Sequence, residues 1–372
     1  MRIAFVSTIL GYPWGGADTL WTNAAEAAAQ QGDSLFISVS PVVAASPRIA
    51  ALGARGARIH LRAPLGAPAS LVTRVARKLR RIAGRDDDDL VAALAAFRPD
   101  LVIISLGGTY DLISHPSWLE WFAATGTRYR LIANWQQENP VLSNTDRALA
   151  RRALRLAEQV NFVSTRNMQV TRRHLLDPLP NAHVVQNPLR WQPADVAPWS
   201  ASPLLQLATV SRLDEGKGIQ LLLHALATPP VRHDWRLNIY GRGPAEAYLR
   251  ETTEHLHLAG QVIFRGYVKD LRSIWAENYL LVSPSLDDGV PMTIPEAMLC
   301  ERPVLATAVG GAEDWLRDGE TGFLCPAPTL PLLVAALRDT FAARERWEGM
   351  GLAAAAAAQA HYRPDDYLRL IA

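Results

Sequence analysis

Short apolar runs recur along the first half of the chain, and longer stretches with the spacing of a helix lie between them. Clear helices are expected at residues 18–31 and 89–97. Because strands that alternate with helices form parallel βαβ units, residues 1–187 are predicted to fold as one Rossmann-like, doubly wound α/β domain. The strands expected in this domain are residues 3–7, 34–39, 101–105, 130–134, 159–164 and 182–186, the last of which should close the sheet.

The alternation stops at a proline-rich segment and then starts again. Residues 188, 193, 198 and 203 are all proline, so the segment 188–203 cannot continue a helix or a central strand and is predicted to be an interdomain linker. The strands expected beyond it are 204–211, 235–241, 262–266, 280–283 and 303–307, and the expected helices are 218–227, 245–257, 271–277, 295–300, 312–317 and others from residue 330.

This layout predicts a second Rossmann-like domain over residues 204–352. Helices over residues 353–372 are expected to end the chain and to pack back on the first domain. Ligands of doubly wound sheets bind where the strands end at their carboxyl termini. Two such domains facing a cleft would therefore place the functional site in that cleft.

Composition narrows the class of protein. The chain has 372 residues, 49% hydrophobic and 20% charged, as in a soluble enzyme of two domains. A net charge of +2 gives no general basis for binding nucleic acid, and the cysteines, Cys300 and Cys325, are too few for a disulfide framework. The start of the chain resembles a buried strand rather than a signal peptide, and no apolar run is long enough to span a membrane. A cytoplasmic protein is expected, with possible peripheral contact at the inner membrane surface.

The first candidate binding loop follows the strand expected at 204–211. Arg212 and Lys217 place two cations five residues apart, after a strand and before a helix. A pyrophosphate requires fixed cations and gains further donors from helix N-terminal amides. A solvated loop with a surface Arg and Lys explains this segment alone equally well.

Two further strands end in glycine, at Gly241 and at Gly266, and Val268 follows the second. Glycine allows a main chain to approach a ligand closely, although most such turns only reverse the chain. Each turn taken alone is a weak indication of a binding site.

The most informative segment runs from Pro284 to Met298. An expected strand leads into a loop that contains Gly289, and a helix then begins with proline and Glu296 in its first turn. Amides at this helix start and the Thr293 hydroxyl suit a diphosphate. The carboxylates of Asp288 and Glu296 can accept hydrogen bonds from sugar hydroxyls. Alternatively, Glu296 complements only the helix dipole and Asp288 is a turn residue.

Together with ERPVLAT at 301–307, VGG at 309–311 and DGETGF at 318–323, this loop resembles the donor-binding region of the family-four glycosyltransferases, in the glycosyl transferases group 1. These are retaining enzymes of the GT-B fold. The resemblance runs in order from about Leu204 to Phe323. Outside that span only the general layout is shared, including Gly15 and Gly16 after the first strand.

The resemblance implies roles for the matching positions. Arg212, Lys217 and Asp288 become the catalytic candidates, with the two cations on the donor diphosphate and Asp288 on the donor sugar. Glu296 would bind the ribose hydroxyls, and the main chain near Val268 would meet the base. The remaining donor-binding candidates are Gly15, Gly16, Gly241, Gly289, Val290, Met292, Thr293 and Ile294.

Three positions depart from the family pattern. Asp288 stands where the family usually has Glu, and Arg242 takes the middle of a turn that usually reads Gly-Asp-Gly. The first-domain His of many members has no clear match after residues 101–105. His115 is out of register and is given no catalytic role.

Two segments of the first domain stay open. The basic amphipathic stretch Leu71–Ile82 could lie on anionic lipid near a lipid-linked acceptor, or it could be a helix packed on the sheet with a solvated basic face. Residues 134–139 could form a polar and aromatic sugar-binding loop or a plain surface loop.

The resemblance implies transfer of a sugar from a UDP- or GDP-linked donor to an acceptor hydroxyl with retention, in cell-surface polysaccharide or glycolipid synthesis. Fixed cations and amides would stabilise the leaving diphosphate, so that neither a metal nor another cofactor is expected. The alternatives are a GT-B sugar-nucleotide epimerase, for which no acid/base pair is evident, and a catalytically silent donor-binding subunit. An NAD-dependent dehydrogenase would need a G-x-G-x-x-G fingerprint that the first domain lacks.

Overall fold

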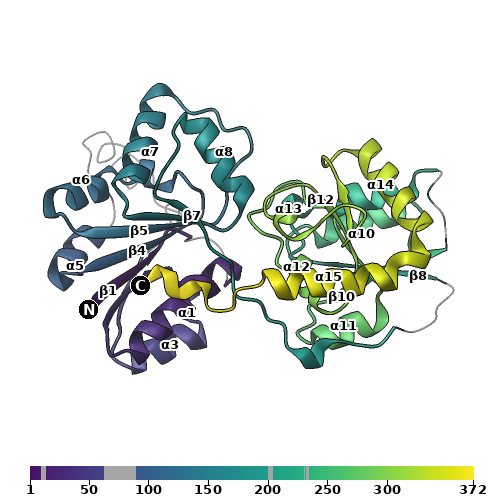
Figure 1. Ribbon diagram of the computed structural model, residues 1–372, viewed down its shortest axis with the longest axis horizontal. Coiled ribbons are helices and arrows are strands. Elements are labelled where there is room, and N and C mark those ends of the chain that lie inside the picture. Colours follow the sequence, from purple (N-terminus) through teal and green to yellow (C-terminus); the bar gives the residue numbers. More distant parts are fainter. Residues whose placement is uncertain (10–13, 63–88, 200–203, 230, 232–233) are drawn as a thin grey trace. The chain divides into compact units, whose positions relative to one another are not determined.

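The computed structural model describes the whole chain except residues 10–13, 63–88, 200–203, 230 and 232–233. The chain forms two compact units (Figure 1). Unit 1 comprises Met1–Pro188 and Pro364–Ala372, and unit 2 comprises Leu189–Arg363. Each unit is an α/β fold built on a parallel sheet, as the pattern of apolar runs predicts.

The sheet of unit 1 has the strand order β3-β2-β1-β4-β5-β6-β7. Its central strand β4 is buried along its whole length, because every residue of the run LVIISL can face a covering layer. The strands are β1 (Arg2–Ser7), β2 (Ser34–Val39), β3 (Arg58–Leu61), β4 (Leu101–Leu106), β5 (Arg128–Ala133), β6 (Gln159–Phe162) and β7 (Ala182–Val184). The helices are α1 (Gly16–Gln30), α2 (Pro41–Ala44), α3 (Pro47–Ala54), α5 (Leu90–Phe97), α6 (Pro116–Thr125), α7 (Asn144–Leu156) and α8 (Thr165–Leu175), with 3-10 turns η1 (Asp111–Ser114) and η5 (Asp366–Leu370).

The sheet of unit 2 has the order β10-β9-β8-β11-β12-β13. Its strands are β8 (Leu205–Val210), β9 (Trp235–Tyr240), β10 (Val262–Gly266), β11 (Leu280–Ser283), β12 (Val304–Thr307) and β13 (Phe323–Cys325). The helices are α9 (Ile219–Ala227), α10 (Glu246–His255), α11 (Leu271–Glu277), α12 (Thr293–Leu299), α13 (Ala312–Trp315), α14 (Leu330–Ala342) and α15 (Trp347–His361), with 3-10 turns η2 (Pro193–Asp195), η3 (Glu215–Lys217) and η4 (Arg344–Arg346).

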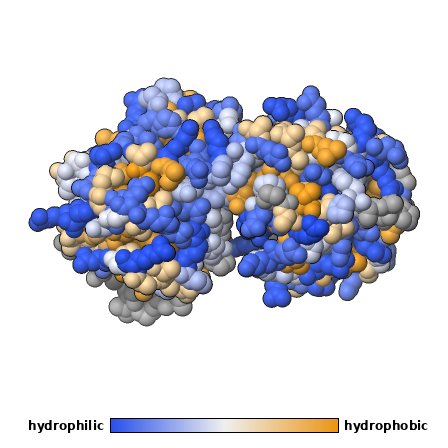
Figure 2. Space-filling model, turned by 60° about the horizontal axis from the view of Figure 1, so that its bottom comes forward, coloured by the Kyte–Doolittle hydropathy of each residue, from blue (hydrophilic) through white to orange (hydrophobic). Residues whose placement is uncertain are grey.

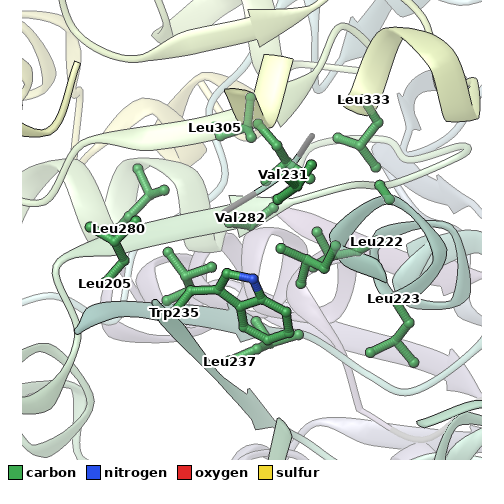
Figure 3. Close-up of a cluster of buried hydrophobic side chains, with 14 of the residues drawn as sticks. Leu205, Leu222, Leu223, Val231, Trp235, Leu237, Leu280, Val282, Leu305 and Leu333 are labelled. Atoms are coloured by element: carbon green, nitrogen blue, oxygen red, sulfur yellow. The ribbon is translucent and has the colours of Figure 1, made fainter. Parts of the chain in front are cut away.

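A large apolar cluster of unit 2 lies between the sheet and the helices α9 and α14 (Figure 3). Trp235 of β9 is 1% exposed, and Leu222 and Leu223 of α9 are fully buried. Leu333 of α14 belongs to the same cluster. Burial of each such side chain stabilises the folded unit by roughly 1.5–3 kcal/mol. This packing holds the strand ends, and the loops that follow them, in fixed positions.

The proline-rich segment expected to be a linker belongs to unit 2 from Leu189 onward. Arg302, which is fully buried, attaches this segment to the unit. Its guanidinium donates to the carbonyls of Ala197 at 2.8 Å and Trp275 at 2.7 Å, and it lies 4.8 Å from the ring centre of Trp199. Burial lowers the Arg302 pKa. Apart from the 3-10 turn η2, the described part of this segment lacks helices and strands, and it is nevertheless docked on unit 2.

The C-terminal segment is divided differently from the prediction. Residues 353–363, including most of α15, belong to unit 2, and only Pro364–Ala372 returns to unit 1. There η5 lies against α1 (Figure 1). The buried Arg130 donates to the carbonyls of Leu370 at 3.0 Å and Ala372 at 2.8 Å, and it pairs with Glu158 at 2.5 Å.

The surface of each unit is mixed, with hydrophilic residues over much of the visible face and apolar residues interspersed (Figure 2). Among the described residues, no helix is both long enough and apolar enough to cross a membrane. The amphipathic stretch Leu71–Ile82 lies outside the described residues.

Candidate functional site

The candidate loops of unit 2 meet at one place in the sheet. The strand order changes direction between β8 and β11, which lie side by side in parallel. Ligands of doubly wound sheets bind beyond the carboxyl ends of the strands at such a point. The segment that carries Arg212 and Lys217 follows β8, and the segment Pro284–Met292 follows β11. Segments about seventy residues apart in sequence therefore become neighbours.

Glycines allow these loops to pack main chain against main chain. Gly218 has φ +65°, and a Cβ at this position would lie 1.9 Å from the carbonyl oxygen of Pro284. Gly241 has φ +135°, and a Cβ there would lie 1.8 Å from the carbonyl oxygen of Ser211. Both conformations and both contacts require glycine. Gly241, expected to allow the approach of a ligand, thus allows the approach of the neighbouring loop.

The loop after β11 is held from its other side as well. Gly310 has φ +52°, and an added Cβ would lie 2.3 Å from the carbonyl oxygen of Asp288. The Thr307 hydroxyl donates to the carbonyl of Ser285 at 2.6 Å, and the Gly311 amide donates to the carbonyl of Gly289 at 2.9 Å. The loop around Asp288 is therefore held by the segment after β8 on one side and by the end of β12 and the segment after it on the other.

Lys217 and Asp288 form an ion pair, with 2.5 Å between Lys217 Nζ and Asp288 Oδ2. The side chains are 25% and 11% exposed, so the pair is partly shielded but open to solvent on one side. The Ser285 hydroxyl lies 3.4 Å from the same carboxylate oxygen. Two of the three catalytic candidates are thus in direct contact.

Arg212, the third catalytic candidate, interacts with its own loop. Its Nε lies 3.0 Å from Asp214 Oδ2, and its side chain is 40% exposed. The Leu213 amide donates to the carbonyl of Arg242 at 3.0 Å, which ties this loop to the turn after β9. An exposed pair of this kind adds little to stability, so Arg212 can change partners at low cost.

Glu296 is buried in α12 and forms a two-pronged ion pair with Arg190. The distance from Arg190 Nε to Glu296 Oε1 is 3.0 Å, and that from Nη2 to Oε2 is 2.9 Å. The hydrogen bond and the charge of Glu296 raise the pKa of Arg190. Sequence analysis missed Arg190 because the residue lies in the segment taken for a linker. An arginine among apolar and proline residues was the only signal.

The start of α12 has fewer available amides than the sequence suggested. The Ile294 amide donates to the carbonyl of Pro291 at 3.0 Å, and that of Glu296 donates to the carbonyl of Met292 at 3.3 Å. Pro295 has no amide hydrogen. Only the positions at the very beginning, Met292 and Thr293, are then left as main-chain donors toward an anion.

The remaining candidates of unit 2 occupy neighbouring strand ends. Gly289 and Val290 lie in the loop after β11, and Val268 follows β10. The Gly241 amide donates to the carbonyl of Gly266 at 2.8 Å, which joins the turns after β9 and β10. Next to Val268, Tyr267 is 63% exposed. An exposed aromatic ring is therefore available at this strand end.

Gly15 and Gly16 belong to unit 1, where Gly15 caps α1. The Gly15 amide donates to Asp18 Oδ2 at 2.9 Å, so the helix uses this donor itself. Burial raises the Asp18 pKa. A side chain on Gly15 would meet nothing within 4 Å.

His115 and the polar residues near the ends of β4 and β5 have structural partners in unit 1. His115 is 6% exposed and stacks on Trp118 at 4.1 Å between ring centres. In the loop 134–139, Gln136 is buried and accepts a hydrogen bond from Thr171, whereas Trp135 is 37% exposed. Asp111 accepts from Thr8 and the Gly107 amide after β4.

In the part of the chain that the structure describes, no group of three or more His, Cys, Asp or Glu side chains could hold a metal ion. Both cysteines are buried and free, and burial raises the Cys300 pKa to about 12.

The sequence and the fold of the chain were compared with those of known proteins. Residues 205–359 match the model of the family glycosyl transferases group 1. The resemblance predicted from the loop motifs is thereby confirmed, and the matched region contains Arg212, Lys217, Asp288 and Glu296.

Individual relatives agree with this class. The chain is 28% identical over 119 residues to N-acetyl-alpha-D-glucosaminyl L-malate synthase of Bacillus anthracis, an alignment that covers 32% of this chain and 31% of that protein. It is 31% identical over 152 residues to the phosphatidylinositol N-acetylglucosaminyltransferase gpi3 subunit of Schizosaccharomyces pombe, covering 40% of this chain and 32% of the relative. The chain thus matches about a third of the length of these curated relatives.

The fold extends the likeness to the entire chain. Anabaena HepE, solved in complex with UDP, has a TM-score of 0.73 and 18% identity, covering 100% of this chain and 98% of that one. With two Rossmann-like units, the fold is the GT-B fold that the sequence predicted.

Proposed function

We propose that the chain transfers a sugar from a nucleoside diphosphate donor to an acceptor hydroxyl and retains the anomeric configuration. The observation that carries this proposal is the contact between Lys217 and Asp288 at the β8/β11 point of the sheet. This contact brings Lys217, the cation that would bind the diphosphate, beside the Asp288 carboxylate, which would accept from a sugar hydroxyl. The family match over the same residues supports it.

In this mechanism, negative charge develops on the diphosphate as the bond to the sugar breaks. Lys217 and Arg212 stabilise that charge, and preorganised donors of this kind contribute on the order of 3 kcal/mol each. The partners that hold these cations in the free protein, Asp288 and Asp214, release them toward the diphosphate. Asp288 then accepts from a sugar hydroxyl. The leaving phosphate helps to take the acceptor proton on the same face of the sugar.

Glu296 would accept from the ribose hydroxyls, and the main chain near Val268 would meet the base. The loop Gly289–Ile294 would contact the sugar and the distal phosphate. We propose UDP as the nucleotide to examine first, because the HepE neighbour was solved with UDP. GDP is the alternative.

We further propose that the reaction needs no metal, since the cations are supplied by side chains. Activity should then survive EDTA, and loss of turnover in EDTA that Mg²⁺ or Mn²⁺ restores would refute this part. The acceptor we propose is a saccharide or a lipid-linked one in cell-surface polysaccharide or glycolipid synthesis, on the cytoplasmic side. The name of the S. pombe relative, with its phosphatidylinositol acceptor, supports this choice.

A panel of UDP- and GDP-sugars tests the function. Release of nucleoside diphosphate with one donor, increased by a suitable acceptor, is the expected result. Tight nucleotide binding without any release would instead identify a silent donor-binding subunit. Conversion of the donor into its epimer without release would identify an epimerase.

A further inference from the structure

The proposed function assigns the Glu296 carboxylate to the ribose hydroxyls, and in this structure that carboxylate is paired with Arg190. The Glu296 side chain is only 3% exposed, whereas that of Arg190 is 48% exposed. Both carboxylate oxygens are occupied by the guanidinium, one by Nε and one by Nη2. Whatever reaches this carboxylate from solvent must therefore pass or displace Arg190.

A ribose diol and a guanidinium can both donate hydrogen bonds to the two oxygens of a carboxylate. Each presents two donors side by side, and such donors bind the two oxygens of a carboxylate together. Each carboxylate oxygen has a second lone pair, but Glu296 has almost no other exposed surface, so the ribose hydroxyls would reach it where the Arg190 fork now lies. The guanidinium and the ribose would then compete for the same side of the carboxylate.

The main chain around Arg190 is anchored, so that the side chain can move alone. The Leu189 amide donates to the Tyr362 hydroxyl at 3.0 Å, and Trp191 packs partly buried against the apolar cluster that contains Ile294. Tyr267 also interacts with Arg190 and helps to raise its pKa. Glu296 remains the main cause of that raised pKa.

On the basis of the proposed function, we propose that Arg190 is a positioning residue that competes with the donor ribose for Glu296 and thereby lowers nucleotide affinity. In the free protein it neutralises the buried Glu296 and holds that carboxylate in place. Nucleotide binding then exchanges the guanidinium for the ribose hydroxyls. Removal of Arg190 removes the competitor.

Titration calorimetry with UDP and GDP tests this competition in the full chain. Arg190→Ala should bind its nucleotide with a dissociation constant about three- to tenfold lower than that of the unmodified protein. Arg190→Gln should show a smaller gain in affinity. The same Arg190→Ala change in a Glu296→Ala background should have no such effect. Pyrophosphate, which has no ribose, should bind Arg190→Ala no more tightly than it binds the unmodified protein.

The outcomes separate this inference from the function on which it rests. If the unmodified protein binds a nucleotide and both folded Arg190 variants bind it equally or more weakly, the competition is refuted and the function stands. A gain in affinity that persists in the Glu296→Ala background also refutes the competition. If neither nucleotide binds the unmodified protein or any of the variants, both proposals fail. Circular dichroism and the thermal midpoint establish that each variant is folded.

Discussion

Lys217 Nζ and Asp288 Oδ2 lie 2.5 Å apart, although 71 positions separate the two residues in the chain. The side chains proposed for the donor diphosphate and the donor sugar thus neutralise each other in the free protein. The same is true of Arg190 and Glu296. In the proposed mechanism, donor binding is an exchange of partners, in which Lys217, Asp288 and Glu296 each pass from a protein partner to a group of the ligand.

The first prediction concerns the cations. Lys217→Ala should lower turnover about a hundredfold or more, because a preorganised charge at the leaving diphosphate is worth on the order of 3 kcal/mol. Arg212→Ala should act in the same direction. The rate of nucleoside diphosphate release under saturating donor measures both. Arg338→Ala, at an exposed arginine of the same unit, is the control and should leave the rate unchanged. Near-normal turnover in both site variants would remove this assignment.

The second prediction separates binding from turnover. Glu296→Ala should chiefly weaken binding of free nucleotide, because it removes the acceptor for the ribose hydroxyls. Loss of a hydrogen-bonded charged partner typically costs about 1.5–3 kcal/mol, or roughly ten- to a hundredfold in the dissociation constant. Fluorescence or calorimetric titration measures it. An unchanged nucleotide affinity in a folded Glu296→Ala protein would show that the ribose lies elsewhere.

The third prediction tests the close packing of the loops. Gly218→Ala should destabilise unit 2 strongly, because the new methyl would lie 1.9 Å from the Pro284 carbonyl oxygen. Gly319→Ala is a matched control: its φ of +75° resembles the +65° of Gly218, but no atom lies within 4 Å of the added Cβ. In the control, the free energy of unfolding should fall only by the cost of the left-handed conformation, about 1–2 kcal/mol. If thermal unfolding shows that the two variants lose the same stability, the contact with Pro284 does not contribute.

The fourth prediction concerns the stability of unit 1 at low pH and the attachment of its C-terminal segment. Hydrogen bonds from Arg128 and Arg130 lower the pKa of Glu158 to about 2. A carboxylate whose pKa is lower in the folded than in the unfolded state stabilises the protein above its unfolded value of about 4.3, and this stabilisation disappears as the pH falls toward 2.

Glu158→Gln should therefore lower stability at pH 7 and reduce the loss of stability between about pH 4.5 and pH 2. Urea unfolding across this range measures both effects. Because Arg130 also binds the last carbonyls of the chain, amide exchange of residues 366–372 should accelerate in the variant. A pH profile parallel to that of the unmodified protein would contradict this prediction.

The strand pattern of the sequence was sufficient for the fold. Strands such as β2 and β11 have the predicted bounds, because continuous apolar runs between helices leave few alternatives for a parallel sheet. The edge strands β3 and β13 and the helices α2, α3, α6, α7 and α8 were not predicted. Helix α7 is rich in arginine and buries only Ala150, Ala153 and Leu154 among its core contacts, so its apolar face is narrow. Its clearest signal is Ser143, whose hydroxyl accepts from the Asp146 amide at the helix start.

The site was predictable as a set of residues but not as a set of contacts. Motif spacing indicated Lys217, Asp288 and Glu296 separately. Which side chains meet depends on the order of the strands, since β8 adjoins β11 only in the folded sheet. Arg190 escaped prediction for the same reason, because nothing near it in sequence points to Glu296. The sequence suggests that Gly241 lets a ligand approach the main chain. In the structure a neighbouring loop, rather than a ligand, requires this glycine.

The central claim, that the loops after β8 and β11 form the donor site, is tested most directly by hydrogen exchange with and without bound nucleotide. With saturating UDP or GDP, exchange should slow in residues 211–218 and 284–296, and it should stay unchanged in α14 of the same unit. Protection confined to other segments, or no protection despite measured binding, would contradict the claim.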